Sequence, residues 1–95
     1  MTDYELMVII DPSLTEKERD ASFAKIKGLV KEFSGKVTSE EIMGEKQLAY
    51  KINRSEKGVY ALYNLKLEWE AVKNMSKEMN LYGELWRYMF VKQEA

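Results

Sequence analysis

The chain has 95 residues and a formal net charge of −1, and it contains neither cysteine nor histidine. A single domain of this length buries roughly 60 to 70% of the unfolded chain's surface, which leaves no room for a second domain. Without cysteine or histidine there can be no disulfide, thiol nucleophile or thiolate metal site, and the commonest general base is missing. An acidic N-terminus and the short apolar run at 6–10 match neither a signal peptide nor a membrane span, so we expect a soluble cytoplasmic protein.

The first half of the chain predicts a strand followed by a long helix. Apolar residues alternate over 4–10, and an Asp-Pro turn at 11–12 ends the strand. Ser13 and Thr15 are both candidate helix caps, because each has a glutamate three residues later. Apolar residues then recur at intervals of three and four until Gly35, where we expect the helix to stop.

The second half predicts two strands, a helix and a last strand. Residues 36–53 are strand-like, with a period-two pattern near their end, and 54–58 read as a loop. A third strand alternates over 59–67. Helical spacing returns at 72–82, and the aromatic-rich segment 85–92 is typical of a strand.

The order strand, helix, strand, strand, helix, strand predicts an α+β fold of the ferredoxin-like βαββαβ type. We expect residues 1–95 to form one such domain, in which two helices cover one face of a four-stranded antiparallel sheet. The other face of the sheet, together with the long hairpin between the second and third strands, is then free to meet a partner.

No pattern in the sequence indicates catalysis. The acidic residues include no isolated pair in an apolar setting, and the five glycines are scattered instead of forming a phosphate-binding loop. We therefore expect a protein that is not an enzyme, with no cofactor, no metal, no small-molecule substrate and no membrane partner.

A basic stretch stands out in this slightly acidic chain. Residues 45–58, EKQLAYKINRSEKG, hold four basic residues against two acidic ones, for a net charge of +2. Together with two cations of the last strand, they form the candidate RNA-binding set: Lys46, Lys51, Arg54, Lys57, Arg87 and Lys92. Such a surface attracts backbone phosphates with salt-sensitive affinity. The alternative is a solvated hairpin whose lysines only protect an edge strand from aggregation.

Two other functions remain open. Lys57-Gly58 before a strand is typical of the RNA-recognition motif, which stacks bases on aromatic residues two positions apart on its open face. Here that face offers only Tyr60 with Leu62, which makes single-strand RNA binding by stacking the weaker hypothesis. A small dimeric regulatory module could instead bury the open face. Its apolar residues would be Met7, Ile9, Leu62 and Met89.

Five blocks of the sequence carry a family resemblance: YE at 4–5, DPSL at 11–14, GEKQLAYKI at 44–52, KGVYALYNL at 57–65 and LWRYMFVK at 85–92. In these blocks the chain resembles the bacterial small-subunit ribosomal protein S6 family. The segment around Leu-Ala-Tyr, after a glycine and a basic residue, is the most specific of the five.

The resemblance implies a ferredoxin-like structural protein of the small ribosomal subunit, without catalysis. It also implies that the chain pairs with small-subunit ribosomal protein eighteen (S18) and docks, as that pair, on the central domain of small-subunit (16S) ribosomal RNA. By position, Lys46 matches a basic residue of the family's second strand and Arg54 a basic position of its hairpin. Arg87 and Lys92 match last-strand residues, which we expect at the RNA or partner surface. The expected partner-binding residues are Tyr50, Leu62 and Met89.

Overall fold

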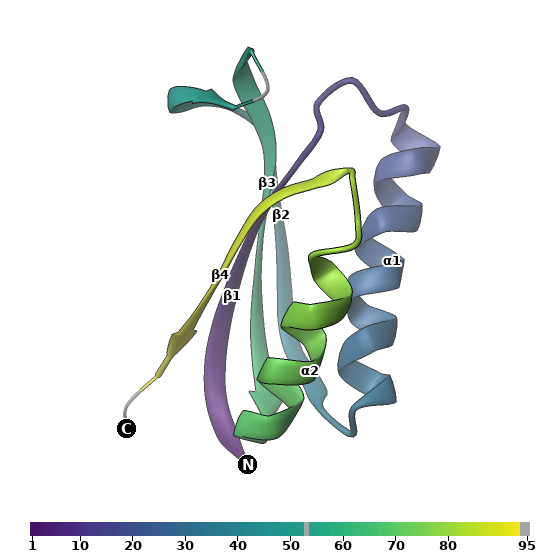
Figure 1. Cartoon of the computed structure of the whole chain (residues 1–95), viewed down its shortest axis with the longest axis vertical. Coiled ribbons are helices and arrows are strands. Elements are labelled where there is room, and N and C mark those ends of the chain that lie inside the picture. The colour runs from purple at the N-terminus through teal and green to yellow at the C-terminus, as the bar shows by residue number, and fades with distance from the viewer. Residues whose placement is uncertain (53, 94–95) are drawn as a thin grey trace.

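The computed structural model describes residues 1–52 and 54–93, without the side chains of 49 and 50. Its elements are β1 (Thr2–Ile10), α1 (Glu16–Glu32), β2 (Lys36–Ile52), β3 (Ser55–Leu67), α2 (Trp69–Met79) and β4 (Leu85–Lys92). The sheet order is β2-β3-β1-β4, with antiparallel neighbours throughout. Both helices lie on the same side of the sheet, which confirms the predicted fold (Figure 1).

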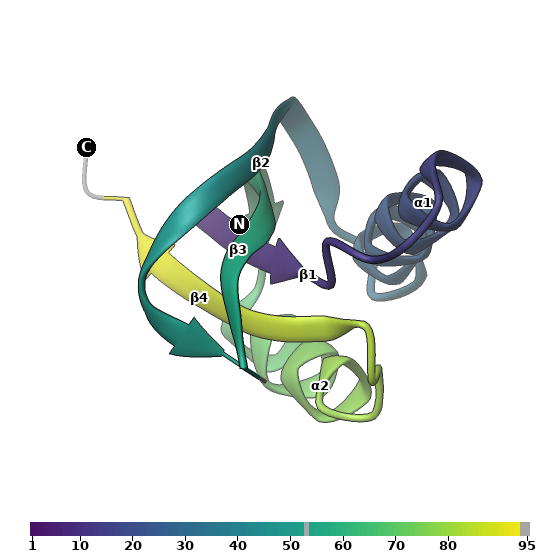
Figure 2. The same ribbon diagram turned by 90° about the horizontal axis from the view of Figure 1, so that it is seen from above.

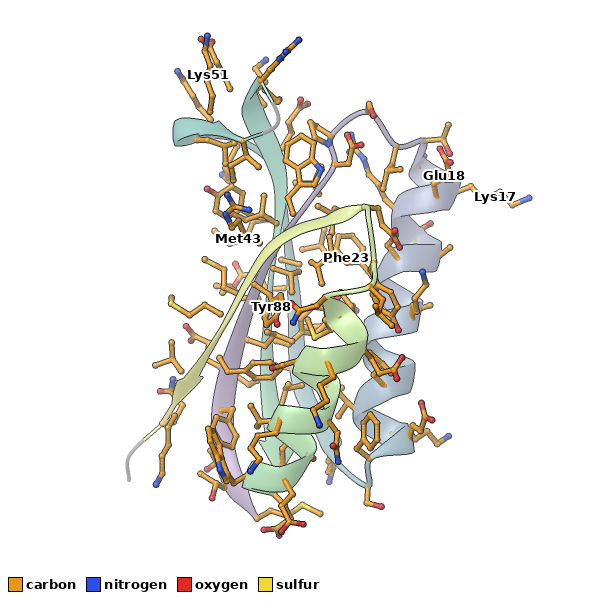
Figure 3. All side chains as sticks on the ribbon, viewed as in Figure 1. Lys17, Glu18, Phe23, Met43, Lys51 and Tyr88 are labelled. Carbon is orange, nitrogen blue, oxygen red and sulfur yellow. The ribbon has the colours of Figure 1, made fainter. Side chains whose placement is uncertain are left out.

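The main core lies between this sheet and the two helices. Leu6, Val8 and Ile10 of β1 are completely buried on the helix side, as the period of two requires. Phe23 of α1 points towards the sheet (Figure 3), and Met75 of α2 is also completely buried. None of the helices in the described part of the chain is long and apolar enough to span a membrane.

The start of α1 shows which candidate cap the chain uses. The Thr15 hydroxyl accepts a hydrogen bond from the Glu18 amide at 3.2 Å, and the Thr15 amide donates to Glu18 Oε1 at 2.9 Å. This reciprocal capping box satisfies two backbone groups at the helix start. Ser13 instead bonds back to Asp11, so Thr15 is the cap.

The turn between β2 and β3 is tighter than the sequence predicted. The loop expected over 54–58 is wrong, because β3 already begins at Ser55 and pairs with Ile52. Arg54 adopts a left-handed conformation, with φ of 67°, which allows the chain to reverse within a short turn. The register shifts between Gln47 and Ile52, so the intervening residues of β2 leave the regular ladder.

The far end of this hairpin bends onto the side of the sheet that the helices leave open. Figure 2 shows the end of β2 curling across that open face towards β4. Leu48 and Ile52 of β2 form a second apolar cluster with Ile9 of β1, against which Tyr60 and Trp86 pack. We call these five residues the hairpin cluster. It is separate from the main core and seals part of the open face.

Candidate nucleic-acid interface

The four hairpin cations are all exposed at one end of the molecule. Lys46 lies in β2, Lys51 near its end, Arg54 in the turn and Lys57 in β3. Figure 3 shows Lys51 at the tip, pointing into solvent. Among residues 1–52 and 54–93, the only ion pair to these cations joins Lys51 Nζ and Glu56 Oε1 at 3.8 Å. Both side chains are 66% exposed, so this pair holds Lys51 only weakly.

Three lysines elsewhere in the fold lie close to carboxylates. Lys25 Nζ lies 2.8 Å from Glu84 Oε1, Lys27 Nζ lies 3.2 Å from Glu40, and Lys66 Nζ lies 2.9 Å from Asp3 Oδ1. Each of these three pairs is shorter than the one between Lys51 and Glu56. Lys46, Arg54 and Lys57 form no such pair among the described residues, so their charges are available to a partner.

The cations occupy both faces of the hairpin ribbon. Lys46 pairs with Gly58, and Lys57 pairs with Gln47, one position further along. Because successive residues of a strand point to opposite sides, Lys46 and Lys57 lie on opposite faces of the ribbon. The hairpin is therefore a two-sided basic finger instead of a flat basic pad.

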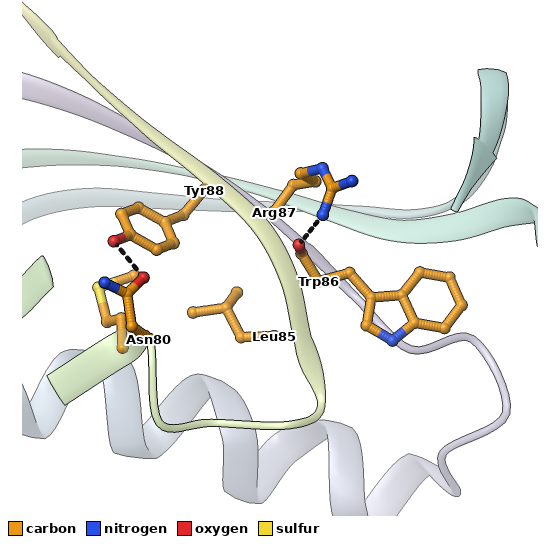
Figure 4. Close-up of a pocket in the computed structure, with 6 residues that line it drawn as sticks. Asn80, Leu85, Trp86, Arg87 and Tyr88 are labelled. Atoms are coloured by element: carbon orange, nitrogen blue, oxygen red, sulfur yellow. Dashed lines mark hydrogen bonds between the residues drawn. The ribbon is translucent and has the colours of Figure 1, made fainter. Parts of the chain in front are cut away.

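Arg87 lies on the same side of the sheet as the hairpin cluster. Its cross-strand partner in β1 is Ile9, and its Nη1 donates to the carbonyl oxygen of Trp86 at 2.8 Å (Figure 4). Lys92 is paired instead with Tyr4, at the opposite end of β4. Five strand residues span about 17 Å. The structure thus brings Arg87 towards the hairpin but leaves Lys92 apart from it.

A groove of about 360 Å³ lies beside Arg87, between the end of α2 and β4. The hydroxyl of Tyr88 donates to Asn80 Oδ1 at 2.7 Å and closes one side of it (Figure 4). In the described part of the chain no three acidic side chains gather where they could hold a metal ion. The two hydrogen bonds drawn at this groove join Tyr88 to Asn80 and Arg87 to Trp86, and neither is a nucleophile-base pair (Figure 4).

Two of the three expected partner-binding residues lie in the middle of the open face. Leu62 and Met89 are both cross-strand neighbours of Met7, so the three side chains form one apolar row. Met89 is 51% exposed. The side chain of Tyr50 lies outside the described residues.

Two sequence expectations for the open face change with the hairpin cluster. Ile9, expected on an exposed dimer face, is buried with only 6% exposure, because the hairpin end covers it. Tyr60, the one aromatic residue available for an RNA-recognition motif, is half-buried against the same cluster. Among the side chains that the structure describes, the open face therefore has no free pair of aromatic residues of the kind on which that motif stacks bases.

The cluster residues were not identified from the sequence. Leu48 and Ile52 read only as part of an alternating strand, and Trp86 only as an aromatic residue of the last strand. A signal was present, because Ile9, Tyr60 and Trp86 are large apolar residues on or beside a face with no helix to cover it.

Comparison with known proteins identifies the family. The model of the family described as ribosomal protein S6 matches residues 3–92. The chain belongs to the ribosomal protein S6 family.

Individual S6 proteins match over nearly the whole chain. The small ribosomal subunit protein bS6 of Beutenbergia cavernae is 32% identical over 95 residues, which cover 100% of this chain and 99% of the relative. The bS6 of Corynebacterium efficiens is 38% identical over 81 residues, or 85% of each chain. The crystal structure of 30S ribosomal protein S6 from Thermotoga maritima superimposes with a TM-score of 0.92 at 25% identity. That match covers 97% of this chain and 87% of the other.

Membership of the S6 family confirms several predictions. The chain is a non-enzymatic structural protein of the small ribosomal subunit and is therefore part of the cytoplasmic ribosome. Its ferredoxin-like fold is that of the Thermotoga S6 protein.

Proposed function

We propose that this S6-family protein binds the central domain of 16S ribosomal RNA as a pair with ribosomal protein S18. The observation that carries the proposal is the basic finger, where four exposed cations have only one weak ion pair among the described residues. Cations without protein partners are available to phosphates, and each phosphate contact adds salt-sensitive affinity. Arg87 extends this site across the sheet, whereas Lys92 would contact RNA separately.

The two-sided arrangement of charge favours one mode of binding. Lys46 and Lys57 point to opposite faces of the ribbon, with Arg54 at its tip. A flat RNA surface could contact only one of these faces. A finger that enters between two RNA backbones would place both lysines near phosphates.

The middle of the open face supports the second half of the proposal. Met7, Leu62 and Met89 form an apolar row there, and the carboxylates of Glu5 and Glu41 lie on the same face beside it. An apolar strip flanked by acids suits a basic protein segment. A bound S18 that supplies such a segment would also add positive charge to a chain whose own net charge is −1.

The proposal is tested by titrating a central-domain fragment of 16S ribosomal RNA with the protein at several salt concentrations, with and without S18. We expect tight binding only when S18 is present. Affinity should fall with salt by roughly one log unit per log of salt for each phosphate contact. A folded protein that binds under neither condition would contradict the proposal.

A double variant, Lys46→Ala with Arg54→Ala, tests whether the hairpin is the RNA-binding site. It should reduce the salt slope by about two, because two phosphate contacts are lost. The matched control is Lys17→Ala with Lys73→Ala, which removes the same charge from exposed helix positions. An unchanged slope in the hairpin variant, or an equal loss in the control, would exclude the hairpin as the RNA site.

Sedimentation separates this function from that of a dimeric regulatory module. We expect a monomer in the absence of S18, because two copies that met at this row would bring the acidic Glu5 and Glu41 of each copy close together. A stable homodimer that excludes S18 would favour the regulatory module.

A further inference from the structure

The hairpin cluster joins strands that are distant in the sheet. Leu48 and Ile52 belong to β2, an edge strand, whereas Trp86 belongs to β4, the opposite edge. Three strand spacings separate these edges, or about 14 Å. The cluster can form only because the end of β2 folds back over β3 and β1 (Figure 2).

This fold-back determines where the hairpin cations lie. Arg87 follows Trp86 in β4 and is paired with Ile9, so it lies beside the cluster. With the hairpin docked, Lys51 and Arg54 are carried towards the side of the sheet that presents Arg87. Without docking, the hairpin cations would project from one edge and Arg87 from the other.

The backbone is shaped for this contact. A side chain at Gly58 would bring its Cβ within 2.5 Å of Ile9 Cγ2 and 3.4 Å of Leu48 Cδ2. Glycine therefore lets β3 approach both residues closely enough for the cluster to close. The packing of the hairpin cluster must also offset the mutual repulsion of the four hairpin cations, which lasts until phosphates neutralise them.

We propose that Leu48 is a positioning residue for RNA binding, because it docks the basic finger on Ile9 and Trp86 and so presets the geometry of the cations. This inference rests on the proposed function of the finger. Leu48 is 9% exposed and carries no charge, so it acts through the residues it holds. If the hairpin is already docked before RNA binds, the affinity for RNA is higher, because only molecules with a docked hairpin are competent to bind.

The test is Leu48→Ala, measured for binding to the 16S central-domain fragment in the presence of S18. If truncation leaves roughly a tenth of the hairpins docked, the dissociation constant rises about tenfold. The salt slope should not change, because every cation is retained. Leu48→Met, which keeps the side-chain volume, should restore affinity.

Hydrogen exchange reports the docking directly. In Leu48→Ala, peptides covering 45–58 should exchange faster, whereas peptides from α1 and α2 in the main core should be unchanged. Leu29→Ala is the matched control, because Leu29 is similarly buried at 6% but lies in the main core. It should lower global stability while leaving the affinity of the folded protein intact.

Each outcome decides between the two proposals. Wild-type affinity in Leu48→Ala, a reduced salt slope, or no rescue by methionine would overturn the positioning role and leave RNA binding by the finger intact. Failure of the unsubstituted protein to bind RNA with S18 would overturn both proposals.

Discussion

Replacing Gly58 by alanine tests how closely the hairpin cluster is packed. The added methyl group would lie 2.5 Å from Ile9 Cγ2, well inside contact distance, and 3.4 Å from Leu48 Cδ2. Ile9 belongs to the central strand β1 and cannot move freely, so the hairpin itself must lift. The substitution should therefore separate the two halves of the cluster.

The magnitude follows from two opposing terms. Overpacking a well-packed site costs about 1 to 3 kcal/mol. Replacing glycine by alanine also lowers the conformational entropy of the unfolded chain, which stabilises the folded state by about 0.4 to 1 kcal/mol. Taking the middle of each range, we expect Gly58→Ala to lower the free energy of unfolding by about 1.3 kcal/mol.

Urea denaturation at pH 7 measures this loss. With a slope of about 1.5 kcal/mol per molar urea, the midpoint should fall by about 1 M. Gly28→Ala is the matched control, because nothing lies within 4 Å of a Cβ there and the residue is in the middle of α1. It should stabilise the protein by about 0.5 to 1 kcal/mol. A Gly58 variant as stable as the wild type, or a Gly28 variant destabilised by a similar amount, would refute this reasoning.

Four further substitutions probe the rest of the fold. Thr15→Ala should lower stability by about 1 kcal/mol through loss of the capping box, whereas Ser13→Ala should have a smaller effect; thermal unfolding of the pair shows whether Thr15 is the cap. Burial raises the pKa of the Tyr63 hydroxyl, as does the neighbouring Glu40, but in the described structure no acceptor meets hydrogen-bond geometry. Tyr63→Phe should therefore leave the free energy of unfolding unchanged or raise it by up to about 1 kcal/mol, and a larger loss in urea would reveal a bonded hydroxyl. The hydrogen bond from Lys25 lowers the pKa of Glu84, so its contribution to stability is present above the ordinary value of 4.5 and is lost as the pH falls through the lowered one. Glu84→Gln should cost about 0.5 kcal/mol at pH 7 and almost nothing at pH 2, and an equal difference at both would rule out this ion pair as the cause.

The order of elements could be predicted because each has a local signature. The period of two in β1 and the three- and four-residue spacing in α1 arise from burial on one face, which is encoded residue by residue. The choice between Ser13 and Thr15 as the cap could not be made, since both have the same spacing to a glutamate. The structure decides it, because the Ser13 hydroxyl donates to Asp11 whereas the Thr15 hydroxyl accepts from the Glu18 amide.

The candidate site was only partly visible in the sequence. The charges along residues 45–58 are enough to locate the basic finger, because the local charge of a segment can be counted without knowing the fold. The placement of Arg87 and Lys92 depends on strand register, which sets them at opposite ends of β4. The fold-back of Leu48 and Ile52 is a non-local contact with Ile9 and Trp86, so no local pattern in the sequence predicts it.

The central claim is that the hairpin cations contact ribosomal RNA. Lysine acetylation, read by mass spectrometry in the complex with S18 and the 16S central-domain fragment, tests it most directly. We predict that Lys46, Lys51 and Lys57 become protected when RNA binds. Lys17, which points away from α1 (Figure 3), should react as it does in the free protein. Equal reactivity of the three hairpin lysines in the free and RNA-bound protein would contradict the account.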